Sequence, residues 1–180
     1  GFCAQYSSGW VHAGEAALLA ELDAETARTF PHVSHMAAGR LQASVLAMLC
    51  EVSGAAHVLE LGTFTGYSAL VLAGCSSVAS VLTVERDPLA AAVARRFFAR
   101  SQAAHKIRLC QADARTDLLR VCAAARAEGG GGEGPPFDLV FLDAGKRDYA
   151  AQRDLLVERL VRLQRPAADQ KAALGLVDAG

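Results

Sequence analysis

Apolar positions along this chain change from helical spacing to short continuous runs and back again. Residues 15–30 carry apolar side chains at helical spacing and stop before a proline, and residues 36–52 repeat the pattern. Both stretches predict amphipathic helices that precede the rest of the fold. The apolar face of the second helix consists of Leu41, Val45, Leu46, Leu49 and Val52.

Short apolar runs at 58–61, 78–84, 107–110, 137–142 and 172–177 predict strands, with helical stretches at 67–73, 89–99, 114–127 and 148–163 between them. Asp87 and Pro88 begin one of these helices as N-cap and first helical residue. Alternating strands and helices predict an α/β fold with a doubly wound parallel sheet. Its ligand crevice is expected where the carboxyl ends of the first and fourth strands meet.

The segment 57–70, HVLELGTFTGYSAL, has a strand that breaks at Gly62 into a turn closed by Gly66. Glycines here allow a ligand to approach the backbone and a helix to start tightly, with its first amides facing that ligand. Glu60, inside the apolar strand, is costly to bury unless it binds something. The alternative is an ordinary strand–helix turn in which the glycines serve geometry alone.

The glycine spacing separates two classes of nucleotide cofactor. A dinucleotide turn has the pattern G-x-G-x-x-G, whereas this turn has E-x-G-x-x-x-G. A nicotinamide-dependent dehydrogenase therefore ranks last among the functions considered. Glu85 ends the second strand about twenty residues beyond the turn, where a ribose-binding acid belongs in such a unit.

Three strings, VLELGTFTGYSAL, TVERDP and FDLVFLDAGKRDY, together resemble the cation-dependent O-methyltransferases that use S-adenosylmethionine, the caffeoyl-CoA and catechol O-methyltransferases. The resemblance covers residues 36–178 and implies the Rossmann-like fold of class I methyltransferases, here truncated after the fifth strand. It implies a single domain over 1–180, with an N-terminal helical segment at 1–56 and a core at 57–180 that lacks the last two strands.

The resemblance also implies a cofactor-binding set at the carboxyl ends of the strands. This set is Glu60, Gly62, Phe64, Gly66, Tyr67, Ser68, Glu85, Arg86, Asp113, Ala114 and Asp143. Asp113 and Asp143 are also compatible with helix caps. Lys146 matches the family lysine that removes the acceptor's proton; the alternative is a solvated surface charge.

A divalent cation, magnesium by preference, would lower the pKa of a phenol oxygen, and the resemblance gives Asp143 and Asp178 as its ligands. An asparagine follows the second aspartate in the resembling enzymes, whereas this chain has Ala179, which leaves weak or absent metal binding open. The alternative for Asp178 is a frayed terminus. His32 and His35 lack a neighbouring acid and are not expected to bind zinc.

The leading hypothesis is transfer of a methyl group from S-adenosylmethionine to a hydroxyl of a catechol-like or CoA-linked phenol. The alternative is a protein of the same fold that binds S-adenosylmethionine without efficient catalysis, as Ala179 and the missing strands suggest. The acceptor and the ion stay open. Relatives of the caffeoyl-CoA type are often dimers, so a homodimer is considered.

Composition and charge limit the classes of partner that this chain is expected to bind. With 18 basic and 19 acidic residues and a net charge of −1, no nucleic-acid partner is expected. Residues 61–84 carry no charge, but the strand, turn and helix pattern explains them, and a membrane span is rejected. The five cysteines lack C-x-x-C spacing and fit reduced thiols, so a cytoplasmic protein is expected. The chain starts at Gly1, which leaves organellar targeting open.

Overall fold

The structure is a computed structural model that describes residues 13–34, 37, 39–114, 116–117, 120–121, 137–144, 150, 153–154 and 157–158. In this part of the chain, a parallel sheet contains β1 (His57–Leu61), β2 (Ser80–Glu85), β3 (Ile107–Gln111) and β4 (Leu139–Leu142). The strand order is β3-β2-β1-β4, so the chain reverses direction across the sheet at β1. The predicted contact between the first and fourth strands is confirmed.

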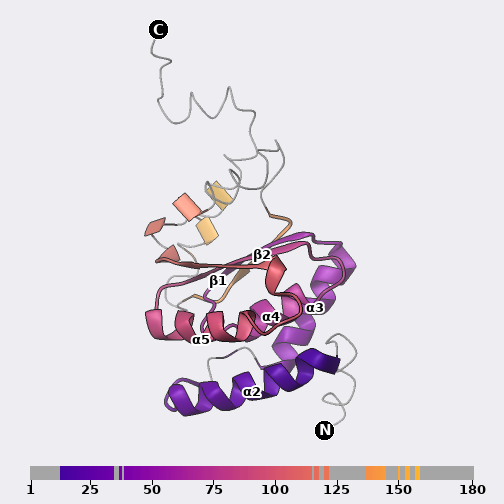
Figure 1. Cartoon of the computed structure of the whole chain (residues 1–180). Coiled ribbons are helices and arrows are strands. Elements are labelled where there is room, and N and C mark those ends of the chain that lie inside the picture. Colours follow the sequence, from indigo (N-terminus) through magenta and orange to yellow (C-terminus); the bar gives the residue numbers. More distant parts are fainter. Residues whose placement is uncertain are drawn as a thin grey trace.

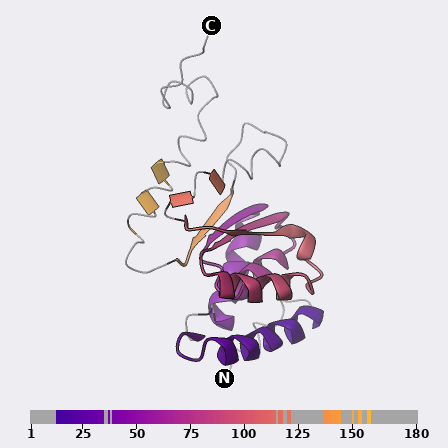
Figure 2. The same cartoon turned by 60° about the vertical axis from the view of Figure 1, so that its left-hand side comes forward.

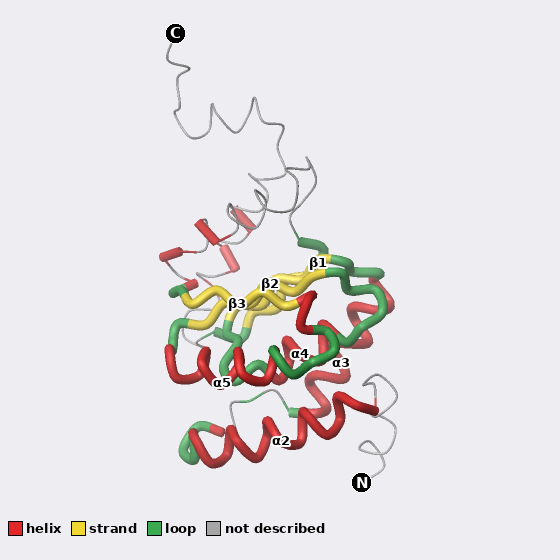
Figure 3. Tube along the Cα trace, in the orientation of Figure 1, coloured by secondary structure: helices red, strands yellow, loops and turns green. Residues whose placement is uncertain are grey.

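The helices form layers on one side of the sheet (Figures 1 and 2). They are α2 (Ala13–Thr29), α3 (Arg40–Ser53), α4 (Tyr67–Ala73) and α5 (Pro88–Phe98), with a 3-10 turn at Ala104–Lys106. Helices α4 and α5 lie against the sheet, α3 packs beside α4, and α2 runs beneath them, as the tube trace also shows (Figure 3). No helix among the described residues is long and apolar enough to cross a bilayer.

Each face of the sheet has its own apolar cluster, because successive strand residues point to opposite sides. Val58 and Val81 face the layer of α4 and α5 and join its core. Leu59, Leu61, Leu82 and Val84 face the other side, where Ala114 and Val121, both in helical conformation, cover them. Side chains therefore cover both faces of the sheet, and the predicted doubly wound, Rossmann-like architecture is confirmed.

Local sequence signals set several boundaries. Helix α4 spans the predicted residues, and α5 begins at Pro88 with Asp87 as its N-cap. The Asp87 Oδ1 accepts hydrogen bonds from the backbone N–H groups of Leu89 and Ala90, at 2.7 and 3.1 Å. The predicted fifth strand at 172–177 and most of the predicted helix at 148–163 lie outside the described residues, as do residues 1–12 of the proposed N-terminal segment.

Helix α3 forms where the apolar pattern predicted it but buries a neighbouring face. Its buried residues are Ala43, Leu46, Ala47 and Cys50. Of the predicted apolar face only Leu46 is buried, while Val52 is 82% exposed. The small side chains allow α4 and the loop after it to lie close, since the Cys75 sulfur lies 3.9 Å from the carbonyl oxygen of Ala47. Close backbone approach therefore decided which face is buried.

Candidate functional site

The turn between β1 and α4, residues 62–66, has three residues with positive φ. These are Gly62 at 100°, Phe64 at 50° and Gly66 at 95°. The N–H of Gly66 donates to the carbonyl of Thr63 at 2.9 Å, which closes the turn just before α4 begins. The N–H of Gly62 donates to the Val84 carbonyl at 2.9 Å, so the pairing with β2 continues into the turn.

Gly62 lies directly against the end of β4. A Cβ atom at this position would lie 2.7 Å from both the carbonyl carbon and the oxygen of Asp143. The N–H of Asp143 donates to the Leu61 carbonyl at 2.8 Å. The carboxyl ends of the first and fourth strands therefore meet here, as the sequence predicted. The sequence attributed this glycine to ligand approach, which stays a prediction; in the structure the backbone of Asp143, the residue after β4, makes a close approach to it.

Gly66 is required by packing as well as by its backbone angle. A Cβ atom there would lie 2.5 Å from the ring of Phe98 in α5. Since the residue is also the N-cap of α4 at positive φ, a side chain would disturb both the helix start and the helix packing. The tight helix start expected from the sequence is confirmed.

Glu85 lies over the turn from the end of β2. Its Oε2 accepts the N–H of Phe64 at 2.7 Å, and its Oε1 accepts the N–H of Asp87 at 2.8 Å. Glu85 is partly exposed and the next residue, Arg86, is exposed. A carboxylate at this edge can accept hydrogen bonds from a diol, such as the two hydroxyls of a ribose.

Glu60 lies behind the turn and is fully buried. Its two carboxylate oxygens accept hydrogen bonds from the hydroxyls of Ser68 and Thr83, each at 2.5 Å. The pKa of Glu60 is raised to about 7, mainly by burial and also by the charges of Asp143 and Glu85, while the two hydroxyl contacts oppose the rise. The partners that the sequence required for this acid are therefore hydroxyl groups of the protein.

The other predicted cofactor residues surround this edge at different depths. Tyr67 is buried, and its pKa is raised by burial and by the charge of Asp23, while Arg40 opposes the rise. Ser68 is buried with Glu60, and Ala114 is buried on the other face of the sheet. The carbonyl of Asp113 accepts the N–H groups of Thr116 and Asp117, as the residue before a helix does.

Lys146, Asp178 and Ala179 lie outside the described residues, as does His35. Among the residues that the structure describes, no group of three or more His, Cys, Asp or Glu side chains is placed to hold a metal ion. Asp143 is the one proposed metal ligand within that part of the chain. The described residues alone therefore do not provide a set of ligands for a cation.

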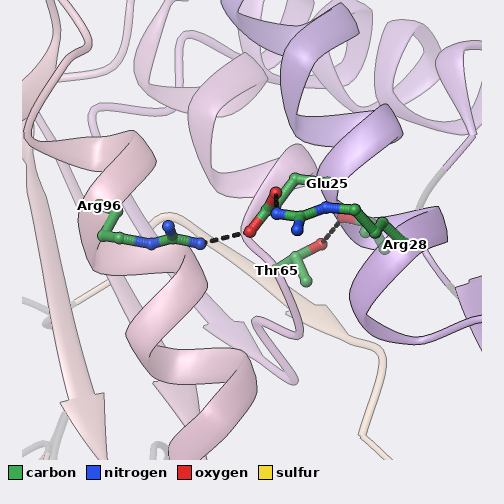
Figure 4. A network of polar contacts seen from close by, with 5 residues as sticks. Glu25, Arg28, Thr65 and Arg96 are labelled. Atoms are coloured by element: carbon green, nitrogen blue, oxygen red, sulfur yellow. Dashed lines mark hydrogen bonds and ion pairs between the residues drawn. The ribbon is translucent and has the colours of Figure 1, made fainter.

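Sequence reasoning missed two residues that contact the turn, Thr26 in α2 and Phe30 directly after it. The hydroxyl of Thr26 donates to the hydroxyl of Thr65, which Figure 4 labels, at 2.8 Å. Both side chains are buried. The rings of Phe30 and Phe64 lie 5.0 Å apart at an interplanar angle of 55°. Thr26 follows Leu22 by four residues and therefore lies on the buried face of its helix. A buried hydroxyl needs a hydrogen-bond partner, and this requirement was the signal in the sequence that could have identified Thr26.

Asp138 was also missed. Its Oδ2 accepts the backbone N–H groups of Ala56 and His57, at 2.9 and 2.8 Å, and so fixes the start of β1 to the start of β4. The sequence treated it only as the polar exception in an apolar run.

Comparison with known proteins gives a consistent group of relatives. A family model described as O-methyltransferase matches residues 9–170. The O-methyltransferase ankF of Aspergillus thermomutatus is 34% identical over 148 residues, which cover 80% of this chain and 57% of that protein. The catechol O-methyltransferase of Mycobacterium tuberculosis is 33% identical over 153 residues, covering 84% and 61%.

Solved structures agree with these relatives. The methyltransferase PaMTH1 of Podospora anserina, bound to SAH, matches with a TM-score of 0.67 and 26% identity, over 87% of this chain and 62% of that one. The O-methyltransferase TomG of Streptomyces achromogenes, in complex with SAM, matches with a TM-score of 0.66 and 27% identity, over 91% and 66%. The chain spans about six-tenths of the length of the curated relatives above.

Proposed function

The chain belongs to the O-methyltransferase family, and from this membership we propose that it binds S-adenosylmethionine at the turn after β1 and transfers the methyl group to a phenolic hydroxyl. The observation that carries the proposal is the meeting of Glu85, the 62–66 turn and Asp143 at one edge of the sheet. Two similar structures hold the methyl donor or its demethylated product, which supports the choice of cofactor.

The proposed cofactor contacts follow from how deeply each residue is buried. Glu85 accepts hydrogen bonds from the ribose hydroxyls, while Gly62, Phe64 and Asp143 form the wall beside the sulfonium. Asp113 is assigned to the adenine side. Gly66, Arg86 and Ala114 are the remaining residues assigned to the lining of the cofactor site. The buried residues Glu60, Tyr67 and Ser68 support this lining from the interior of the fold.

The proposed reaction is a direct displacement. The acceptor oxygen attacks the methyl carbon, the carbon–sulfur bond breaks, and its electron pair stays on sulfur, leaving a neutral thioether. The protein's main task is to hold oxygen, carbon and sulfur in line. A phenol has a pKa near 10 and must lose its proton, and we assign that proton to Lys146, which acts as the base.

A divalent cation held by Asp143 and Asp178 would further lower the pKa of the phenol. Because the described residues do not by themselves fit a metal, no step is assigned to one. The dependence of turnover on added magnesium, with a chelator as the comparison, tests this part of the proposal separately.

The acceptor class we propose is a catechol or a CoA-linked phenol, since a relative at 33% identity is named catechol O-methyltransferase. Homodimer formation stays a prediction, and sedimentation measures it. The proposal includes no nucleic acid, since the net charge of −1 gives little attraction to phosphates.

Incubation with isotope-labelled S-adenosylmethionine, magnesium and a panel of catechols tests the function. The expected result is a labelled methyl ether with at least one catechol. No labelled product is expected from the matched monophenols, in which one catechol hydroxyl is already a methyl ether. Calorimetry with S-adenosylmethionine and S-adenosylhomocysteine runs in parallel. Tight binding of both compounds without methyl transfer to any acceptor contradicts the proposed enzymatic activity. It supports the alternative, a protein of the same fold that binds S-adenosylmethionine without efficient catalysis.

A further inference from the structure

The turn that carries the proposed cofactor contacts contains a strained residue. Phe64 has φ 50°, and it is the one non-glycine residue with positive φ in the described part of the chain. A bulky side chain is strained in this region, so surrounding contacts must hold it there. The N–H of Phe64 donates to Glu85, which fixes the turn from the side of the sheet.

Helix α2 holds the same turn from the opposite side. Thr26 donates its hydroxyl hydrogen bond to Thr65, the residue after the strained one, and both side chains are at most 2% exposed. One helical turn later, the ring of Phe30 packs against the ring of Phe64. Thr26 near the end of α2 and Phe30 directly after the helix therefore contact the two consecutive residues at the centre of the turn.

We propose that Thr26 and Phe30 are positioning residues that hold Phe64 and Thr65 in the conformation that receives the cofactor, so that a helix outside the nucleotide-binding core sets cofactor affinity. The inference rests on the proposed function, because it assigns the cofactor to this turn. If the turn opens in a fraction of the molecules, the apparent affinity falls in proportion to the competent fraction that remains.

Helix α2 also supplies a matched control. Glu25 pairs with Arg96 of α5 at 2.6 Å (Figure 4). Glu21 pairs with Arg100, two residues after the end of α5, at 2.5 Å. These pairs attach α2 to the fold without contacting the turn, and exposed pairs contribute little to stability. Arg96→Ala therefore changes how α2 is attached but spares the contacts of Thr26 and Phe30.

The experiment compares Thr26→Val, Thr26→Ser, Phe30→Leu and Arg96→Ala with the wild type. Two quantities are measured: the Kd for S-adenosylhomocysteine by calorimetry, and amide hydrogen exchange over residues 62–68 without ligand. Thr26→Val should weaken binding about three- to tenfold, the loss expected for one buried hydrogen bond, and should accelerate exchange in the turn. Phe30→Leu should act in the same direction. Thr26→Ser, which keeps the hydroxyl, should restore both values, and Arg96→Ala should match the wild type.

A lowered unfolding temperature in Thr26→Val, with turn exchange and Kd unchanged, overturns the inference, because α2 then supports the fold alone. Equal weakening by Arg96→Ala overturns it too, since any loosening of α2 would then suffice. A wild type that binds neither S-adenosylmethionine nor its product removes the proposed function itself. That failure is distinguishable, because it appears before any variant is compared.

Discussion

Two glutamates on neighbouring strands, Glu60 and Glu85, lie close to the same turn in opposite surroundings. Glu60 is fully buried and bonds to two side-chain hydroxyls, whereas Glu85 is partly exposed and bonds to two backbone amides. The pKa of Glu60 rises to about 7 mainly because of burial. One acid therefore belongs to the interior of the fold and the other to its partly exposed edge.

The difference shows that two acids near one turn can have opposite surroundings, which their positions in the sequence do not reveal. Both residues stand near a strand end and both suggested cofactor binding in the sequence. Glu60 pairs with Thr83 across the sheet, and Thr83 also bonds to the hydroxyl of Thr63. A buried acid with two hydroxyl partners shapes the turn, and an acid on backbone amides at the edge can still accept further hydrogen bonds.

The largest expected effect comes from disturbing the contact between the turn near both acids and the residue after β4. Gly62→Ala places a methyl group 2.7 Å from the backbone of Asp143, and neither backbone can yield easily. We expect a loss of at least about 3 kcal/mol in the free energy of unfolding, measured with urea. Gly54→Ala is the control, since it has a similar positive φ with open space around it, and it should cost about 1 kcal/mol. Equal losses in the two variants would contradict the contact.

The pH dependence of stability tests the interior acid. The pKa of Glu60 is about 7 in the folded protein against an ordinary 4.5, so between these values the folded state holds a proton that the unfolded chain has lost. The stability that Glu60 contributes is fully present below pH 4.5 and is lost as the pH rises through 7. The loss amounts to about 3 kcal/mol at most. Urea unfolding from pH 5 to pH 8 should show this fall in the free energy of unfolding of the wild type and a flatter dependence in Glu60→Gln. Parallel pH dependences in the two proteins would refute the role of Glu60.

The smallest expected effect concerns the edge acid. Glu85→Gln keeps one acceptor oxygen but removes the charge, and we expect about a tenfold weaker Kd for S-adenosylmethionine, near 1.4 kcal/mol. Stability should change by less than about 1 kcal/mol, since the side chain is partly exposed. Glu21→Gln, an exposed acid on α2, serves as the control in calorimetry. Unchanged affinity in Glu85→Gln would place the nucleoside elsewhere.

Local signals in the sequence predicted the elements that carry the site. The two glycines marked the turn, the Asp87-Pro88 pair marked the start of α5, and the apolar runs marked the strands. These features depend on backbone conformation within a few residues, so they are readable from a single sequence. The strand order followed from general rules of connection in parallel sheets.

Features that depend on contacts between distant segments were not predicted. The apolar pattern of α3 identified a helix, but the small residues Ala43 and Ala47 determined its buried face. The contact of Thr26 with Thr65 joins residues 39 positions apart, and the partners of Glu60 lie on α4 and β2. Periodicity indicates that a side chain is buried, but the tertiary fold decides what it meets.

The close approach of Gly62 to Asp143 has an evolutionary consequence. A side chain at this position is excluded by the architecture of the sheet, whether or not a ligand binds. A descendant without the proposed methyl transfer would therefore still retain this glycine under selection for folding alone. Substitution at Glu85, whose carboxylate faces the edge, would be the earlier mark of such a loss.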